Sequence, residues 1–257
     1  MYFYKKTDKL IFCAIIDLIK TKRGIDMSYR VIIFDLDDTV LDFKAGEKKG
    51  LATVFKHFNT AMLDYDAWVA TYIEINAHVW QAIEKGAESQ PLLIQRFSET
   101  FAAFGQSIDG VAAEALYRQV LNDNDAVIAG AAEVLEALYQ KGYQLVVGTN
   151  GKTATQYQRL KLTGFHRYFE HIVISEEIGH AKPSQAFFEH IVALYPEQTK
   201  DAFLMVGDTL STDILGAHQV DIASVWLNQS GQQALGKAYQ PTYTISNISD
   251  LMSVLTI

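Results

Sequence analysis

The spacing of hydrophobic positions changes twice along the chain and divides it into three regions. Four apolar residues, 31–34, form a short continuous run that is typical of a buried strand in a parallel sheet. From residue 44 to about residue 124, apolar positions recur at helical spacing without strand-like alternation. From Gly130 onward, helical segments alternate with short apolar runs. This alternation predicts a parallel sheet joined by right-handed crossovers, and therefore an α/β fold.

The middle region predicts a small helical bundle inserted after the first strand. Its helical segments cover residues 44–58, 64–83, 91–104 and 110–121. Aromatic residues are frequent on these segments. We interpret four of them as the interior of the bundle, with ligand contact as the alternative: Trp68, Trp80, Phe97 and Phe101.

The last region predicts the remaining strands and the helices between them. Helices are expected over 131–139, 153–162, 184–194 and 212–220, and strands over 144–148, 171–175, 203–206, 223–227 and 242–245. Gly142 and Gly164 mark helix ends, and Ser184 is a candidate N-cap. Glu176 and Glu177 follow a strand, and we expect them to lie in a solvated loop.

Charge and cysteine content narrow the choice of partners and compartment. The 257 residues carry a formal net charge of -8, from 30 acidic and 22 basic residues. This balance argues against nucleic acid or an anionic membrane as the main partner. The single cysteine, Cys13, excludes an intramolecular disulfide and fits a reducing cytoplasm. The seven histidines show no metal-ligand spacing.

Residues 1–26 resemble a signal peptide only in part. The apolar run 10–16 follows three lysines, but it is short, Asp17 interrupts it, and no small-residue cleavage site follows. It is also too short to span a membrane. Met27 stands directly before the first strand. We expect 1–26 to be a dispensable extension from a misplaced start, with a short amphipathic helix docked on the core as the alternative.

The first strand is followed by three carboxylates within four positions, including Asp35 and Asp37. Burying that much negative charge without a counter-ion is costly, and carboxylate oxygens suit Mg²⁺. Ligands also bind beyond the carboxyl ends of strands in open α/β sheets. An acidic turn without a ligand is the alternative.

Two other strand ends carry complementary side chains. Thr149 and Asn150, which follow the second predicted strand, offer hydrogen-bond donors. Asp208 follows a later strand, and Lys182 lies in the loop before a helix. If these strands are neighbours, one site combines a carboxylate cage, hydrogen-bond donors and one fixed cation. That combination suits phosphoryl transfer, in which positioning and charge neutralisation supply most of the catalysis.

These residues resemble the motifs of the haloacid dehalogenase superfamily of aspartate-nucleophile hydrolases. The run 34–39 matches hydrophobic-Asp-x-Asp-x-Thr, and Thr149 matches the strand that ends in Thr or Ser. Lys182-Pro183 matches the third motif, a lysine often followed by proline. Gly207-Asp208 with Asp213 matches the fourth, Gly-Asp followed by a second aspartate. Each motif is weak alone, but four in the right order are specific. The resemblance covers residue 31 to the C-terminus.

The resemblance implies a role for each matched residue. Asp35 is the nucleophile that forms an aspartyl-phosphate, and Asp37 protonates the leaving oxygen and then activates water. Mg²⁺ is held by Asp35, the Asp37 backbone carbonyl and Asp208, with Asp213 supporting its shell. The phosphate-binding residues are Thr149, Asn150 and Lys182.

The resemblance also implies a division of the chain. A Rossmann-like parallel-sheet core comprises 27–43 and 125–257, and a helical cap inserted after the first strand comprises 44–124. Such caps shield the site from water and select the substrate.

A finer resemblance is to the noncanonical pyrimidine nucleotidase branch. It rests on residues 149–151, 174–179, 181–183, 204–209 and 211–216, on Trp226-Leu227-Asn228, and on Asn76, Trp80 and Arg96-Phe97 of the cap. This branch implies hydrolysis of pyrimidine nucleoside 5'-monophosphates. Within the cap, Trp80 would stack on the base and Arg96 would reach a carbonyl, with a structural role as the alternative for both.

Other functions are left open by the residues. Phosphoglycolate or a sugar phosphate are alternative substrates, because cap residues choose the substrate and the motifs do not. A 2-haloacid dehalogenase is less favoured, because halide leaves without a proton donor and that branch lacks the second aspartate, Asp37. A non-enzymatic phosphate-binding regulator is a further alternative. We expect a monomer or homodimer that binds a small phosphorylated metabolite in the cytoplasm.

Overall fold

The computed structural model describes residues 29–233, 236 and 240–257. The expected extension, 1–26, and the candidate start at Met27 lie outside the described residues. Within the described ranges, no helix has both the length and the apolar character that a membrane span requires.

Over the described residues, six parallel strands form one sheet in the order β3-β2-β1-β4-β5-β6. Their bounds are β1 Val31–Phe34, β2 Gln144–Thr149, β3 His171–Ile174, β4 Phe203–Gly207, β5 Ala223–Leu227 and β6 Tyr243–Ile245. The predicted parallel sheet is confirmed. Phe34 lies opposite Val147 of β2 and Val206 of β4, so β1 is central and the strand order reverses there. Ligands bind beside such a reversal point in open α/β sheets.

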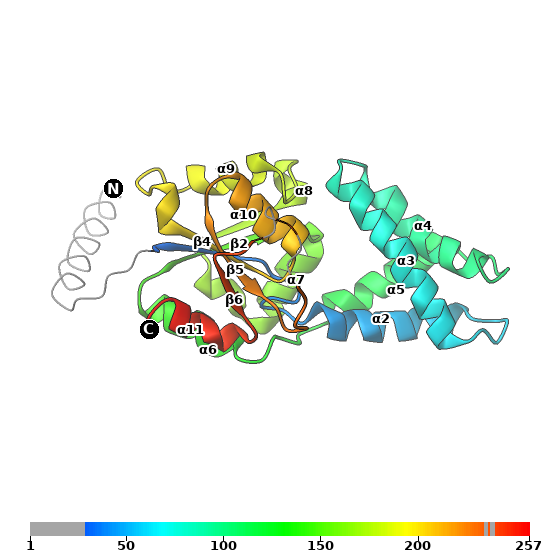
Figure 1. The fold of residues 1–257 in the computed structure, drawn as a ribbon. Coiled ribbons are helices and arrows are strands. Elements are labelled where there is room, and N and C mark those ends of the chain that lie inside the picture. Colours follow the sequence, from blue (N-terminus) through cyan, green and yellow to red (C-terminus); the bar gives the residue numbers. More distant parts are fainter. Residues whose placement is uncertain (1–28, 234–235, 237–239) are drawn as a thin grey trace, which may run out of the picture.

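Helices cover both faces of the sheet (Figure 1). The bounds are α6 Ala131–Gln140, α7 Thr153–Thr163, α8 Ser175–Ile178, α9 Gln185–Ala193, α10 Leu215–Gln219 and α11 Leu251–Val254. Ile32 and Phe34 face a cluster with α6, α7 and α11, whereas Val31 and Ile33 face one with α9 and α10. Successive side chains of a strand point to opposite faces, so a four-residue apolar run serves two cores.

The helices of the middle region lie together at one side of the sheet core (Figure 1). They are α2 Phe43–Phe58, α3 Tyr65–Glu84, α4 Ser89–Ala102 and α5 Gly110–Asn122. Three begin after an aspartate whose carboxylate accepts a backbone N–H of the first turn: Asp42, Asp64 and Asp109. The predicted helical bundle is therefore present, whereas its division from the core at 44–124 stays a prediction.

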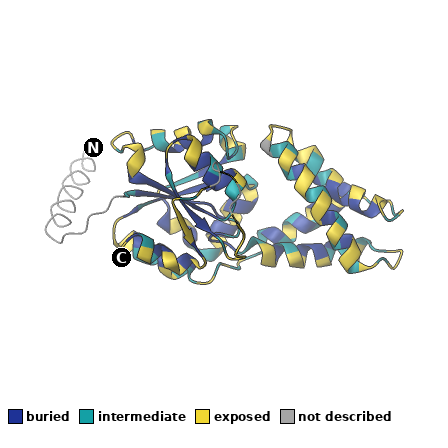
Figure 2. Ribbon diagram, in the orientation of Figure 1, coloured by how far each residue is buried: buried dark blue, intermediate teal, exposed yellow. Residues whose placement is uncertain are grey.

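The bundle helices carry buried residues of their own (Figure 2). Many of the residues in this separate core are aromatic. Trp68, Phe97 and Phe101 are fully buried in it, which confirms their predicted place. Trp80 is different, because it is only partly buried and lines a cavity instead. The prediction of a core position is wrong for this residue.

Several element boundaries differ from the sequence prediction. Helix α4 begins at Ser89, before Pro91, because the first turn of a helix needs no backbone N–H from proline. The segment predicted as helix 212–220 opens with a wide π-helical turn, Leu210–Ile214, before α10. Ser184 occupies the N-cap position of α9 without a side-chain cap hydrogen bond.

Glu176 and Glu177 are exposed to solvent, as expected, but the expectation that they lie in a loop is wrong. Both residues belong to the short helix α8, and Glu176 forms an ion pair with Lys152. Lys152 also donates to the hydroxyl of Ser89 at 3.3 Å. This group of contacts joins the sheet core to the start of α4 in the bundle.

Candidate active site

All nine residues predicted for the site line one cavity of about 230 Å³ at the carboxyl edge of the sheet: Asp35, Asp37, Trp80, Arg96, Thr149, Asn150, Lys182, Asp208 and Asp213. Asp35 directly follows β1, Thr149 ends β2 and Asp208 directly follows β4. The three strands are adjacent and parallel, so their ends meet. Trp80 and Arg96 come from the bundle and line the same cavity.

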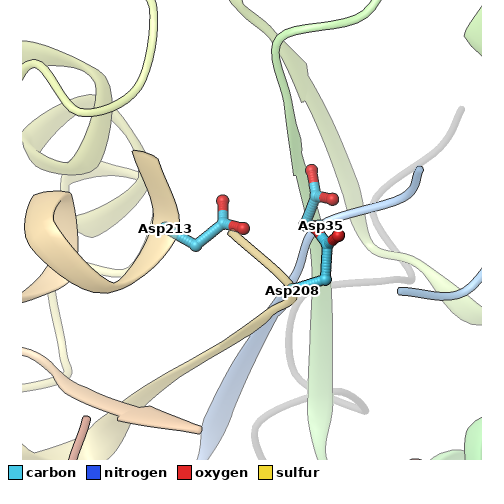
Figure 3. A group of neighbouring side chains, drawn as sticks. All are labelled: Asp35, Asp208 and Asp213. Atoms are coloured by element: carbon cyan, nitrogen blue, oxygen red, sulfur yellow. The ribbon is translucent and has the colours of Figure 1, made fainter. Parts of the chain in front are cut away.

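Asp35, Asp208 and Asp213, which all line the cavity, form an acidic cluster (Figure 3). One carboxylate oxygen from each lies within 4.8 Å of the others. The backbone N–H of Thr209 donates to Asp213 at 3.1 Å and orients it. Gly207 allows this approach, because a Cβ there would lie 2.3 Å from an Asp213 oxygen. The site therefore depends on glycine at the end of β4.

Lys182 is the cation of this cluster. Its Nζ donates to Asp35 at 2.6 Å and to Asp213 at 2.7 Å, and the residue is 2 % exposed. Asn150 holds the backbone of Lys182 through both halves of its amide, each at 2.9 Å. Asn150 thus places the lysine, and direct phosphate contact by Asn150 stays a prediction.

The carboxylates of the cluster carry more negative charge than Lys182 neutralises. Burial raises the pKa of Asp35 well above its usual value; Lys182 opposes this rise, and neighbouring aspartates, Asp213 foremost, add to it. Burial, followed by the charge of Asp213, raises the pKa of Asp208 to about 7. Burial acts to lower the pKa of Lys182, but Asp213 and Asp35 raise it overall. A cation bound among these oxygens would remove the repulsion, and Mg²⁺ prefers such ligands.

Asp37 stands apart from the acidic cluster. Its Oδ1 accepts from Nη1 of Arg159 at 2.5 Å, and its Oδ2 accepts from Nε2 of Gln156 at 2.8 Å. Sequence analysis missed both α7 residues. They are three positions apart and so share a helix face, but that spacing alone does not distinguish them from solvated polar residues. The predicted metal contact through the Asp37 backbone carbonyl stays a prediction.

Arg96 is held inside the bundle. It is 2 % exposed and donates to Asn76 and Glu114, each at 2.7 Å. Glu114 also accepts from Arg118 at 2.6 Å. Arg118 lines the cavity with a side chain that is 22 % exposed, and sequence analysis did not identify it. One glutamate thus orients two guanidinium groups toward the cavity wall.

Known proteins resemble this chain over most of its length. The family model for haloacid dehalogenase-like hydrolases matches residues 29–221. Pyrimidine 5'-nucleotidase PynA of Streptococcus pneumoniae is 35 % identical over 89 % of this chain and 96 % of its own length. Pyrimidine 5'-nucleotidase YjjG of Escherichia coli is 29 % identical over 89 % of this chain and 99 % of its own length. The magnesium-bound crystal structure of YfnB from Bacillus subtilis superposes on this chain with a TM-score of 0.81. The two sequences are 32 % identical, and the match covers 89 % of this chain and 99 % of YfnB.

Proposed function

Because the chain belongs to the haloacid dehalogenase-like hydrolase family, we propose that it is a Mg²⁺-dependent phosphomonoesterase for pyrimidine nucleoside 5'-monophosphates. The observation that carries the phosphatase chemistry is the acidic cluster with its buried lysine at the carboxyl edge of the sheet. The pyrimidine preference rests on the two nucleotidase relatives. A cytoplasmic location and a monomeric or dimeric state stay predictions.

The proposed reaction has two steps that share Asp35 and Asp37. A carboxylate oxygen of Asp35 forms a bond to phosphorus while the bond to the leaving oxygen breaks, and the carboxyl of Asp37 gives that oxygen a proton. A water molecule then loses a proton to Asp37 and attacks phosphorus, which breaks the bond to Asp35 and releases phosphate. Lys182 and Thr149 bind the phosphoryl oxygens during both steps.

Mg²⁺ fits the acidic cluster by charge and by ligand type. Asp35, Asp208 and the Asp37 carbonyl would hold it, and Asp213 would support that shell. When bound, the ion neutralises the charge that builds up between the nucleophile and the phosphoryl group. A 2-haloacid dehalogenase is disfavoured, because halide needs no proton from Asp37.

Trp80 is proposed to choose the leaving group. Trp80→Ala should lower kcat/KM for deoxyuridine 5'-monophosphate by roughly 5- to 150-fold, because stacking on a base is worth about 1–3 kcal/mol. The loss for p-nitrophenyl phosphate should be far smaller. Steady-state kinetics with both esters, and with a purine nucleotide, measure the preference.

Trp80→Phe should keep most of the nucleotide activity, since it keeps a ring. Ile73→Ala is the matched control, because Ile73 lies on the same helix but is 57 % exposed. Equal losses for nucleotide and generic ester would place Trp80 in a structural role. A purine nucleotide or sugar phosphate as the better substrate would overturn the pyrimidine assignment and leave the phosphatase chemistry in place.

The contacts of Arg96 favour a structural role over the predicted base contact. Arg96→Met should destabilise the protein by about 3 kcal/mol, because removing one partner of a buried ion pair leaves the other uncompensated. Breaking a buried ion pair costs about 3–5 kcal/mol. We expect the low end of that range because Glu114 keeps its ion pair with Arg118. Thermal unfolding measures the loss. A variant of wild-type stability that loses only nucleotide activity would restore the base contact.

A further inference from the structure

We propose that Arg159 and Gln156 are positioning residues that hold the carboxyl group of Asp37 toward the leaving oxygen. The inference rests on the proposed function, because it takes Asp37 as the acid and base of the reaction. Neither α7 residue is needed for the acidic cluster, which forms from other elements. Their contacts converge on Asp37 instead.

The two donors bind different oxygens of the Asp37 carboxylate, so they fix both the position and the rotation of that carboxylate. Arg159 Nη1 binds Oδ1 at 2.5 Å, and Gln156 Nε2 binds Oδ2 at 2.8 Å. The Asp37 side chain nevertheless remains 29 % exposed and lines the cavity with Asp35. A proton on Asp37 therefore remains within the space that a substrate would occupy.

Arg159 is itself fixed at the junction between sheet core and bundle. It is fully buried, and its Nε donates to the backbone carbonyl of Asn124 at 3.3 Å. The Asn124 amide donates in turn to the carbonyl of Asp42 at 2.8 Å, which ties together the chain segments that enter and leave the bundle. The ring of Phe43 faces the guanidinium of Arg159, with 6.0 Å between the ring centroid and Cζ. The guanidinium thus has little freedom to move away from Asp37.

Gln156 connects Asp37 to the phosphate side of the site. The same Nε2 donates to the hydroxyl of Thr149 at 3.0 Å, and Gly151 leaves room for the amide, since a Cβ there would lie 2.1 Å from it. The Gln156 Oε1 is buried without a hydrogen-bond partner. A half-turn of the amide would present this acceptor to a protonated Asp37, so glutamine suits both protonation states of the reaction.

The test uses a pair of esters that differ mainly in the need for a proton. Phenyl phosphate releases a poor leaving group, whereas p-nitrophenyl phosphate releases an anion that departs readily without protonation. Arg159→Met should lower kcat/KM about 100-fold for phenyl phosphate, the scale of a misplaced catalytic group, and only a few-fold for p-nitrophenyl phosphate. The ratio of the two values reports proton donation, because kcat/KM covers the steps through departure of the leaving group.

Asp37→Asn should show the same selective loss, and adding Arg159→Met to it should cause no further loss for phenyl phosphate. Lys161→Met, on the exposed face of α7, is the matched control and should leave the ratio unchanged. Arg159→Lys should retain more phenyl phosphate activity than Arg159→Met, and it serves as the test variant if the methionine variant does not fold.

Equal losses for both esters in the Arg159 variants, or additive losses in the double variant, would overturn the inference and make Arg159 a support of the fold. If Asp37→Asn is selective and the Arg159 variants are not, only this inference fails. If Asp37→Asn lowers kcat/KM equally for both esters, the proposed acid role of Asp37 fails as well.

Discussion

Asp35→Asn is expected to lower kcat by about 10⁴-fold or more, because it removes the proposed nucleophile and activity then rests on binding alone. The fold should stay intact. Lys182 keeps its bond to Asp213, and the substitution removes one of the repelling buried carboxylates. Without added metal, the melting temperature of the variant should equal or exceed that of the wild type. Steady-state phosphatase assays and thermal unfolding measure the two expectations.

Asp201→Asn is the matched control for Asp35→Asn. Asp201 is exposed and lies just before β4, at the edge of the sheet away from the cavity, so the same chemical change should leave turnover unaltered. Rapid-quench experiments should trap a phosphorylated wild-type enzyme but no phosphorylated Asp35→Asn. Wild-type turnover in Asp35→Asn would exclude the covalent mechanism.

Removal of divalent metal by a chelator is expected to lower activity by about 10³-fold, on the scale of several kcal/mol of charge stabilisation that a catalytic ion provides. Mg²⁺ should also stabilise the folded protein. At tenfold excess over its Kd the gain is about 1.4 kcal/mol. For a chain of this size, that corresponds to an increase of roughly 3–5 °C in Tm. Full activity in excess chelator, or halide release from a 2-haloacid, would favour the dehalogenase alternative.

The stabilisation by Mg²⁺ should depend on pH in a defined direction. The pKa of Asp208 is about 7 in the folded protein, above its ordinary value of 3.8. The folded state therefore binds more protons than the unfolded state between these values, and the metal-free protein loses stability as pH rises through them. Because Mg²⁺ needs ionised oxygens, its effect on Tm should be larger at pH 8 than at pH 5. Asp208→Asn should reduce the effect at both pH values, whereas Asp201→Asn should keep it.

The strands and the floor of the cavity were predictable because their signals are local. A continuous four-residue apolar run is typical of a strand that is buried on both faces, as the strands of a parallel sheet with helices on each side are. Once the strands are parallel and adjacent, Asp35, Thr149 and Asp208 must meet at one edge. The type of these residues and their order in the sequence were sufficient to indicate a carboxylate site.

The roles of bundle residues were less predictable, because helical periodicity identifies a buried face but not what lies beyond it. Trp68 and Trp80 follow the same apolar pattern, yet Trp68 is fully buried and Trp80 borders the cavity. Glu176 and Glu177 have the composition of a solvated loop, but an ion pair with Lys152 anchors Glu176 on a short helix. Each outcome depends on contacts with distant segments.

The sequence by itself determined the succession of strands and helices along the chain, apart from the short helices α8 and α11. It also determined the acidic end of the first strand and the set of side chains available for phosphoryl transfer. The tertiary structure alone decided how those side chains are held. Arg159 is 122 positions from Asp37 in the chain, and Asn150 is 32 from Lys182, yet each pair is in hydrogen-bond contact. No local pattern encodes such pairs, because they exist only after packing has set α7 against the end of β1 and the Lys182 loop against the end of β2.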